Sequence, residues 1–244
     1  MIAPVLAGGR SRRMGRAKAT VPLGGRPLIA WPIAAAAEAG LDPVVVAKPG
    51  SELPELGVPV WHEPERVSHP LAGLVCALER AGGPVVALAC DMPFVPAELI
   101  ARLAAADGVA AVPRQPFPGR YDPAALPVLR EALAREAPVT EALAALAPAV
   151  IDADPRDLAG VNTPEELAAA SLRVMPTAEQ WIERFAAALG RPAPTEQERE
   201  AVLKLASVAA HASERRAAPV ACWLAASAGV SLDEALALAR QLGP

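Results

Sequence analysis

LAGGRSRRMGRAK, residues 6–18, continues an apolar run at residues 2–6. The run predicts a short buried strand, so the glycines fall where an α/β sheet releases its chain at the carboxyl end of a strand, the edge at which such sheets bind ligands. Gly8, Gly9 and Gly15 allow backbone N–H groups to approach a ligand closely. The segment also holds five cationic residues and no acidic one, in a chain of net charge −4. It is typical of a triphosphate cradle, and an ordinary surface turn is the alternative.

Composition predicts a soluble protein. The 244 residues suffice for one large domain or for a domain with a smaller partner. Hydrophobic residues make up 53% of the chain without forming a run of membrane-spanning length, and no signal peptide is indicated. We therefore expect no membrane partner, and we also expect no nucleic-acid partner. The three cysteines lie far apart without a C-x-x-C pair, which favours a reducing, cytoplasmic location: Cys76, Cys90 and Cys222.

Strand and helix patterns alternate through the first two-thirds of the chain. The strand patterns lie at residues 43–47, 58–61, 84–90, 109–112 and 150–153, and residues 116–119 are rich in turn formers. The helical patterns lie at residues 26–39, 70–81, 96–106, 127–135 and 139–146, with a capping box at Thr163 before a further helix. This alternation predicts an α/β domain at residues 1–174 with a three-layer, mostly parallel (Rossmann-like) sheet.

Residues 175–244 show a different pattern and predict a small all-α domain. Four helices are expected, at residues 178–189, 196–211, 218–227 and 232–242, and Thr195 and Ser231 have capping-box spacing. One face of the first helix is apolar, and we expect it to form the core of a helical bundle: Trp181, Ile182, Phe185 and Leu189. The role of this domain does not follow from its sequence.

Four motifs in order resemble those of the MobA-like nucleotidyltransferases, whose best-known members are molybdenum cofactor guanylyltransferases. L-A-G-G-x-S-x-R-M-G precedes Lys18, P-L-A-G lies at residues 70–73, C-D-x-P at residues 90–93 and N-T-P at residues 162–164. The first string is neither a Walker loop nor a G-x-G-x-x-G fingerprint. The resemblance covers about residues 1–172 and implies a nucleotide-diphospho-sugar-transferase-type sheet. Residues 211–219 resemble an uncharacterised helical domain that is fused to MobA-like domains.

Asp91 is the candidate metal ligand on chemical grounds. Nucleotidyl transfer requires positioning and positive charge around the phosphates, and Mg²⁺ supplies that charge when one or two carboxylates hold it together with phosphate oxygens and waters. Asp91 ends the most strand-like run of the chain, where an acid would face the glycine loop. A plain turn residue or a helix N-cap is the alternative for this position.

The resemblance implies a role for each matching residue. Lys18, Asp91 and Arg13 are the candidate catalytic residues, and Asp91 is the candidate Mg²⁺ ligand. Asn162 is implied to lie near the metal or the acceptor. The nucleotide would be bound by eight residues: Leu6, Ala7, Gly8, Gly9, Lys18, Glu63, Leu71 and Asp91.

Two positions depart from the family pattern. Gly160 replaces the first asparagine of N-x-N-T-P, and Ala47 stands where asparagine is frequent. The acidic position before P-L-A-G falls on Glu63, with His62 competing for the same place in the alignment. The departures at Gly160 and Ala47 concern binding of the pterin acceptor more than binding of the nucleotide.

The sequence therefore predicts an enzyme that moves GMP from Mg-GTP to the phosphate of molybdopterin cofactor and releases pyrophosphate. GTP and molybdopterin would be its substrates, and molybdoenzymes or other proteins of cofactor biosynthesis its partners. A cytidylyltransferase, or a nucleotidyltransferase with another phosphorylated acceptor, is the nearest alternative. A non-catalytic GTP-sensing module is the alternative from another class, and the presence of both Lys18 and Asp91 argues against it.

Overall fold

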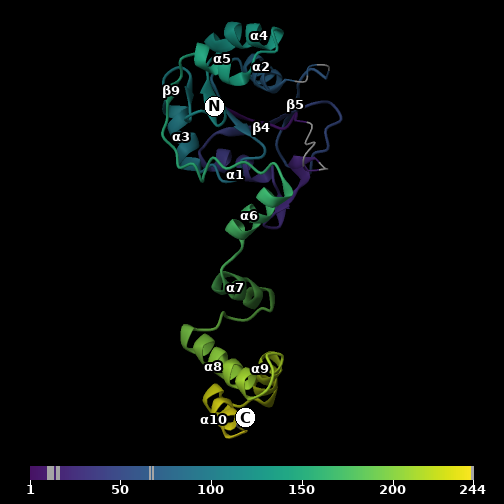
Figure 1. The fold of residues 1–244 in the computed structure, drawn as a ribbon, viewed down its shortest axis with the longest axis vertical. Coiled ribbons are helices and arrows are strands. Elements are labelled where there is room, and N and C mark those ends of the chain that lie inside the picture. The colour runs from purple at the N-terminus through teal and green to yellow at the C-terminus, as the bar shows by residue number, and fades with distance from the viewer. Residues whose placement is uncertain (10–13, 15–16, 66, 68, 243–244) are drawn as a thin grey trace. The chain divides into compact units, whose positions relative to one another are not determined.

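A computed structural model describes residues 1–9, 14, 17–65, 67 and 69–242 of the chain. Two compact units follow one another along the sequence, Met1–Met175 and Pro176–Pro244. The strands described lie in the first unit, and the regular elements described in the second are helices (Figure 1).

The first unit is built on a seven-stranded sheet, whose strands are β1 (Ile2–Leu6), β4 (Asp42–Ala47), β5 (Val60–His62), β6 (Val85–Ala89), β7 (Ala110–Ala111), β8 (Gly119–Tyr121) and β9 (Ala149–Val150). Their spatial order is β5-β4-β1-β6-β8-β7-β9. β1 pairs in parallel with β4 and β6, and β5 and β9 pair in parallel with β4 and β7. The prediction of a mostly parallel sheet is confirmed, and the carboxyl ends of β1, β4 and β6 lie at one edge.

β8 is the strand of this seven-stranded sheet that the sequence pattern does not predict. It runs antiparallel to both β6 and β7. Its three residues are buried, and the Tyr121 hydroxyl donates to Pro116 O at 2.6 Å. Pairing with a buried neighbour, and not the weak strand propensity of Gly-Arg-Tyr, decides the conformation of this segment.

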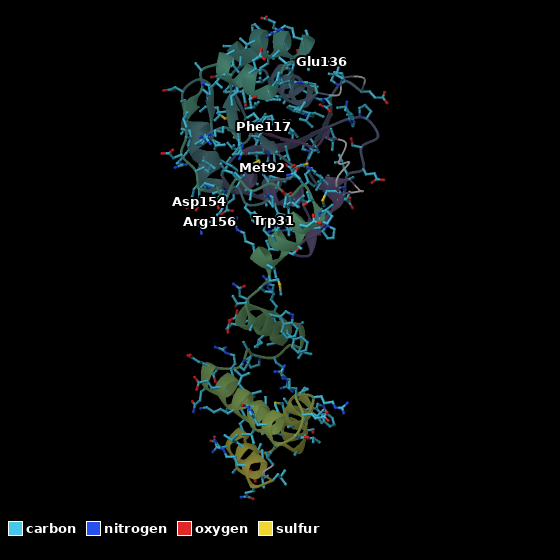
Figure 2. The ribbon with its side chains drawn as sticks, in the orientation of Figure 1. Trp31, Met92, Phe117, Glu136, Asp154 and Arg156 are labelled. Carbon is cyan, nitrogen blue, oxygen red and sulfur yellow. The ribbon has the colours of Figure 1, made fainter. Side chains whose placement is uncertain are left out.

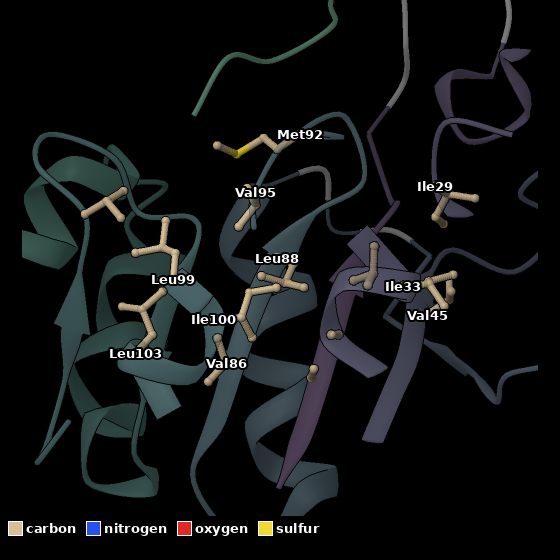
Figure 3. Packing of buried hydrophobic residues seen from close by; sticks show 14 of the residues in the cluster. Ile29, Ile33, Val45, Val86, Leu88, Met92, Val95, Leu99, Ile100 and Leu103 are labelled. Atoms are coloured by element: carbon tan, nitrogen blue, oxygen red, sulfur yellow. The ribbon is translucent and has the colours of Figure 1, made fainter. Parts of the chain in front are cut away.

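Helices cover both faces of the sheet (Figure 1). α1 (Ala30–Glu38) and α3 (Ala97–Ala105) pack on one face, and α2 (Pro70–Ala81), α4 (Leu126–Ala134) and α5 (Val139–Ala145) pack on the other. Alternate residues of β6 serve the two faces, as the pleat requires. Val86 and Leu88 lie beside Ile100 of α3 (Figure 3), while Val85 and Ala87 join the cluster under α2.

α1 begins four residues later than the predicted helix at residues 26–39. The first residues of the predicted helix instead belong to a hairpin, in which β2 (Pro22–Leu23) pairs antiparallel with β3 (Arg26–Pro27). Gly24 and Gly25 turn the chain with positive φ angles of 58° and 83°, a conformation that glycine adopts readily and that two-residue hairpin turns need. Trp31, labelled in Figure 2, donates from Nε1 to Leu23 O at 3.2 Å and so fastens the hairpin to α1.

α6 (Pro164–Val174) ends the first unit and packs on this hairpin. Thr163 caps it with the predicted reciprocal capping box, in which Thr163 Oγ1 accepts from Glu166 N at 3.2 Å. Leu23, Val161 and Ala170 are buried together in this cluster. The end of α6 is part of the same contact, because a Cβ added at Gly24 would lie 3.0 Å from Val174 Cγ2.

The second unit contains α7 (Ala178–Ala188), α8 (Glu196–Ala212), α9 (Ala217–Ala228) and α10 (Leu232–Leu242). Its buried core is small and consists of Leu205, Ala225 and Ala235. The expectation that the apolar face of α7 forms a bundle core is wrong in this structure, because Trp181 and Phe185 are 55% and 51% exposed. The two rings stack on each other one helical turn apart, with centroids 5.1 Å apart.

Candidate active site

Side chains from three motifs meet at the carboxyl edge of the sheet. Lys18 Nζ donates to Asp91 Oδ2 at 2.8 Å and to Asn162 Oδ1 at 2.5 Å. Lys18 begins a short 3-10 turn, η1 (Lys18–Thr20), while Asp91 follows β6 and Asn162 precedes the N-cap of α6. Lys18 therefore lies within hydrogen-bonding distance of two other residues singled out from the sequence.

Backbone hydrogen bonds join the loops that carry these side chains. Cys90 N donates to Leu6 O at 3.2 Å, and Val161 N donates to Asp91 O at 2.7 Å. Asn162 N is held by Glu166 Oε2 at 2.6 Å, which ties the N-T-P motif to the first turn of α6. The cluster is thus attached to the sheet on one side and to α6 on the other, the support that a preorganised site needs.

The Lys18–Asp91 ion pair is sheltered but open to a ligand. The two side chains are 18% and 22% exposed. Asp91 Oδ1 accepts no hydrogen bond from the described residues, so this oxygen can face a hard cation while Oδ2 stays on the ammonium. An ammonium beside a carboxylate can bind a metal-loaded phosphate group, because the ammonium contacts phosphate oxygens and the carboxylate contacts the metal.

Cys90 lies next to this cluster without being a candidate nucleophile. Burial raises the pKa of its thiol to about 12, and the negative charge of Asp91 acts in the same direction. The thiolate is the reactive form of cysteine. The Cys90 thiol therefore stays protonated and unreactive at neutral pH.

Glu63 forms a second part of the site, against two of the glycines in the motifs. Its side chain is 5% exposed. A Cβ at Gly8 would overlap Glu63 Oε1, and a Cβ at Gly73 would lie 3.1 Å from Glu63 Oε2. The glycines of L-A-G-G and P-L-A-G therefore make room for one carboxylate. His62, which competes with it in the alignment, is exposed.

The Glu63 carboxylate is buried without a hydrogen-bond donor from the described residues, and a ligand could supply one. Burial raises the pKa of Glu63, and the positive charge of Lys48 lowers it. Lys48 Nζ lies 4.0 Å from Glu63 Oε1, an ion-pair distance that is too long for a hydrogen bond. Among the described residues no group donates a hydrogen bond to this carboxylate. Its oxygens are therefore free to accept from a bound molecule.

Leu71, a predicted nucleotide-binding residue, lies in the first turn of α2. Its side chain is fully buried in the cluster under α2. Its backbone N–H donates to Nδ1 of His69, the N-cap of α2, at 3.2 Å. A contribution of Leu71 to nucleotide binding would thus be one of helix position and not of side-chain contact.

The remaining predicted nucleotide residues surround the first strand end. Leu6, Ala7 and Gly8 are half-buried and Gly9 is exposed. Ala7 N donates to Val46 O at 2.8 Å, so the strand pairing continues into the glycine loop. Arg13, the third candidate catalytic residue, lies outside the described residues.

The two departures from the family pattern have distinct structural settings. Ala47 is fully buried at the end of β4. Gly160 lies beside the cluster, since a Cβ there would be 2.9 Å from Asn162 Nδ2 and 3.8 Å from Asp91 O. The glycine therefore leaves space for the orientation in which Asn162 accepts from Lys18.

Lys48 is the site residue that the sequence patterns miss. It is one of three lysines in the chain and directly follows a buried parallel strand, β4. That position is the available signal, because the residue after such a strand lies at the ligand-binding edge of an α/β sheet.

Comparison with protein families supports the sequence interpretation. The family described as the MobA-like NTP transferase domain matches residues 3–158, and a domain of unknown function (DUF6457) matches residues 173–242. The molybdenum cofactor guanylyltransferase of Rhodobacter capsulatus is 38% identical over 186 residues, which cover 70% of this chain and 94% of the relative. That of Rhizobium leguminosarum is 42% identical over 110 residues, 50% of its length.

Solved structures share the fold of the first unit. Molybdopterin-guanine dinucleotide biosynthesis protein A from Archaeoglobus fulgidus aligns with a TM-score of 0.61 at 25% identity, over 71% of this chain and 98% of that protein. The 2-C-methyl-D-erythritol 4-phosphate cytidylyltransferase from Thermus thermophilus aligns over 70% of this chain and 98% of its own, with a TM-score of 0.55 at 22% identity, a likeness of fold alone. Within the described ranges, no helix has the length and apolar character to cross a membrane.

Proposed function

The chain belongs to the MobA-like NTP transferase family, and we propose that it transfers GMP from GTP to the phosphate of molybdopterin cofactor. An oxygen of the acceptor phosphate would attack the α-phosphorus of GTP. The bond from that phosphorus to the bridging oxygen of the β-phosphate breaks, and pyrophosphate leaves. The product is the guanine dinucleotide form of the cofactor.

The observation that carries this proposal is the meeting of Lys18, Asp91 and Asn162. Lys18 Nζ lies 2.8 Å from Asp91 and 2.5 Å from Asn162, although the three residues come from distant parts of the chain. Transfer of a nucleotidyl group depends mainly on positioning and charge. A cation, a carboxylate and an amide at one sheet edge provide both.

Lys18 would bind phosphate oxygens of the triphosphate and stabilise the charge that builds up on the leaving pyrophosphate. Its ammonium already lies in a hydrogen-bonded position that is only 18% exposed. Fixing a charged donor before the substrate arrives reduces the reorganisation needed in the transition state. We include Arg13 in the same role because it belongs to the same basic loop.

Asp91 would hold Mg²⁺ together with oxygens of GTP. The residue fits this role because Oδ2 is engaged by Lys18 while Oδ1 receives no hydrogen bond from the described residues. Mg²⁺ is commonly bound by one or two carboxylates plus substrate phosphates and waters. When bound, the ion supplies positive charge at the phosphates.

Glu63 would accept hydrogen bonds from the guanine base. Guanine presents two neighbouring donors, its ring N–H and its amino group, whereas cytosine and adenine present a donor beside an acceptor. A carboxylate can accept from both guanine donors at once. The Glu63 oxygens lie against Gly8 and Gly73, in the motifs that the family resemblance assigns to the nucleotide.

The acceptor would bind on the Asn162 side of the cluster. Asn162 Oδ1 accepts from Lys18, so its amide nitrogen points toward Gly160. That amide N–H group can donate to a phosphate oxygen. Gly160 leaves the approach open, because it adds no side chain next to Asp91.

Pyrophosphate release tests the proposal directly. The purified chain with Mg-GTP and molybdopterin cofactor should release pyrophosphate, and the rate should fall to background when the acceptor is omitted. GTP should be strongly preferred to CTP. Equal rates with both nucleotides would retain the reaction class and reject the base assignment. GTP binding without turnover under any of these conditions would favour a sensing module.

The cellular setting is proposed from the same assignment. The guanine dinucleotide cofactor is used by molybdoenzymes, so we propose transient contacts with such enzymes or with other proteins of cofactor biosynthesis. A cytoplasmic location agrees with three free cysteines in the structure. Affinity capture with the intact chain, with and without Mg-GTP, tests these contacts.

A further inference from the structure

Lys48 makes three polar contacts with one segment. Its ammonium donates to Glu65 O at 3.1 Å and to Val67 O, and lies 4.0 Å from Glu63 Oε1. The segment connects β5 to the N-terminus of α2, where P-L-A-G begins. Lys48 thus ties the end of β4 to the connection that carries Glu63.

Among the described residues, two backbone hydrogen bonds support this connection, and the longer one runs from Val67 N to Pro64 O at 3.4 Å. Glu63 N donates to Ala47 O at 3.0 Å, which continues the pairing of β4 with β5. Beyond Glu63, the carbonyls of Glu65 and Val67 accept from the Lys48 ammonium. One flexible side chain, itself 18% exposed, therefore serves as the common donor for the segment.

We propose that Lys48 is a positioning residue of the nucleotide site, which holds the carbonyls of Glu65 and Val67 and keeps the Glu63 carboxylate against Gly8, ready to accept from guanine. The inference rests on the proposed function, because guanine is the base assigned to Glu63. Lys48 itself need not touch the nucleotide. It would act by placing a buried acceptor and by offsetting the loss of hydration of that acceptor.

The charges around Glu63 make this role measurable. Burial raises the pKa of Glu63, and among the described residues Lys48 supplies the positive charge that lowers it. α2 contributes Cys76, whose thiol has a raised pKa through burial and the charge of Glu63 and so stays neutral. Gly8 and Gly73 present no side chain. Removing the Lys48 charge should therefore raise the pKa of Glu63 and protonate it over a wider pH range.

The test compares equilibrium binding of Mg-GTP by the intact chain in two variants of matched shape. Lys48→Gln retains hydrogen-bond donors for Glu65 O and Val67 O but removes the charge, whereas Lys48→Arg retains the charge. Lys48→Gln should raise the Kd by about tenfold at pH 6, and this loss should shrink at pH 8, because a buried carboxylate that has lost its neighbouring cation stays protonated to higher pH. Lys48→Arg should follow the wild type at both pH values. Lys204→Gln, at a largely exposed lysine paired with Glu200, is the control for losing a lysine.

Glu63→Gln keeps the test decisive if a Lys48 variant is poorly folded in thermal melts. This variant cannot titrate, so its Kd should not change across the same pH range, and Lys48→Gln added to it should introduce no pH dependence. An equal loss at both pH values in Lys48→Gln, or no loss at all, would overturn the positioning role and leave Lys48 as a structural clamp. A pH dependence that persists in Glu63→Gln would also overturn it.

Failure of the inference can be told apart from failure of the proposed function. If the wild type turns over GTP with the acceptor and Lys48→Gln binds GTP normally at all pH values, only the inference fails. If the wild type binds Mg-GTP without turnover while Lys48→Gln shows the predicted pH effect on binding, only the transfer proposal fails. Absence of GTP binding by the wild type would overturn both.

Discussion

The two units of the chain bury different residues. In Met1–Met175, fully buried branched residues such as Val45 and Val86 fill both faces of a sheet between helices. In Pro176–Pro244, the buried core is Leu205 with two alanines, while Trp223 is 66% exposed. The residues with a proposed chemical role all lie in the first unit. A site that depends on distances of a few tenths of an ångström needs the first kind of scaffold.

If the first unit carries the chemistry, substitution of Asp91 should have the largest effect on turnover. In the wild type, Lys18 Nζ lies 2.8 Å from Asp91 Oδ2. Asp91→Asn keeps the shape of the side chain and an acceptor for Lys18, but it removes the charge proposed to hold Mg²⁺. Turnover should fall by at least about 100-fold with the fold intact, the scale of losing one electrostatic contributor. Pyrophosphate release measures the loss. Asp107→Asn, at an exposed residue after α3, is the control and should keep full activity; near-normal activity in Asp91→Asn would move the site elsewhere.

A smaller effect is expected from Gly8→Ala, which tests whether packing around the carboxylate is as tight as the fold suggests. The new Cβ would overlap Glu63 Oε1 and push the carboxylate from its place. Overpacking of this kind costs about 1–3 kcal/mol, so the KM for GTP should rise by about tenfold. Gly83→Ala provides the matched change, because a Cβ at Gly83 meets no atom within 4 Å. An unchanged KM in Gly8→Ala would mean that Glu63 does not face the nucleotide.

The motifs predicted most of the active-site cluster because their chemistry constrains the backbone. Glycines at a strand end, an acid after a buried strand and a capped helix start are local signals, and Lys18, Asp91 and Asn162 do meet. β8 was missed because pairing with β6, and not its own propensity, makes it a strand. The role of Lys48 was missed because it depends on carbonyl groups 17 and 19 residues away.

Burial in the helical unit could not be predicted from periodicity alone. The apolar stripe of α7 has helical spacing, yet Trp181 and Phe185 stack on each other and remain about half exposed. Amphipathic spacing shows which residues share a face, and it does not show what covers that face. In the first unit, the apolar faces of the helices pack against a sheet, and the register of strand pairing determines which strand residues face them. Their burial therefore follows from the sheet.

Leu205→Ala tests the separate character of the helical unit. Leu205 is 2% exposed, and its truncation should destabilise that unit by about 2–5 kcal/mol. Hydrogen exchange of the α8 amides should accelerate, while exchange in β6 and the affinity for Mg-GTP stay unchanged. Leu203→Ala removes the same atoms from a side chain that is 68% exposed on the same helix, and it should alter none of these. Faster exchange in β6 of Leu205→Ala would show that the two units are energetically coupled.

The smallest effect is expected from removing the helical unit altogether. A chain cut after Met175 keeps α6, whose Val174 packs at Gly24 and whose Glu166 holds Asn162 N at 2.6 Å. Its affinity for Mg-GTP should match that of the intact chain, because interfaces between domains of one chain are usually modest. A cut after Thr163 is the sharper contrast: it removes α6 and the Glu166 anchor, so Mg-GTP binding should weaken even where the sheet remains folded by circular dichroism. Titration of GTP into the three proteins shows whether the C-terminal unit contributes to nucleotide binding. Weaker binding by the longer truncated protein, with its circular dichroism preserved, would show that the helical unit helps to build the nucleotide site.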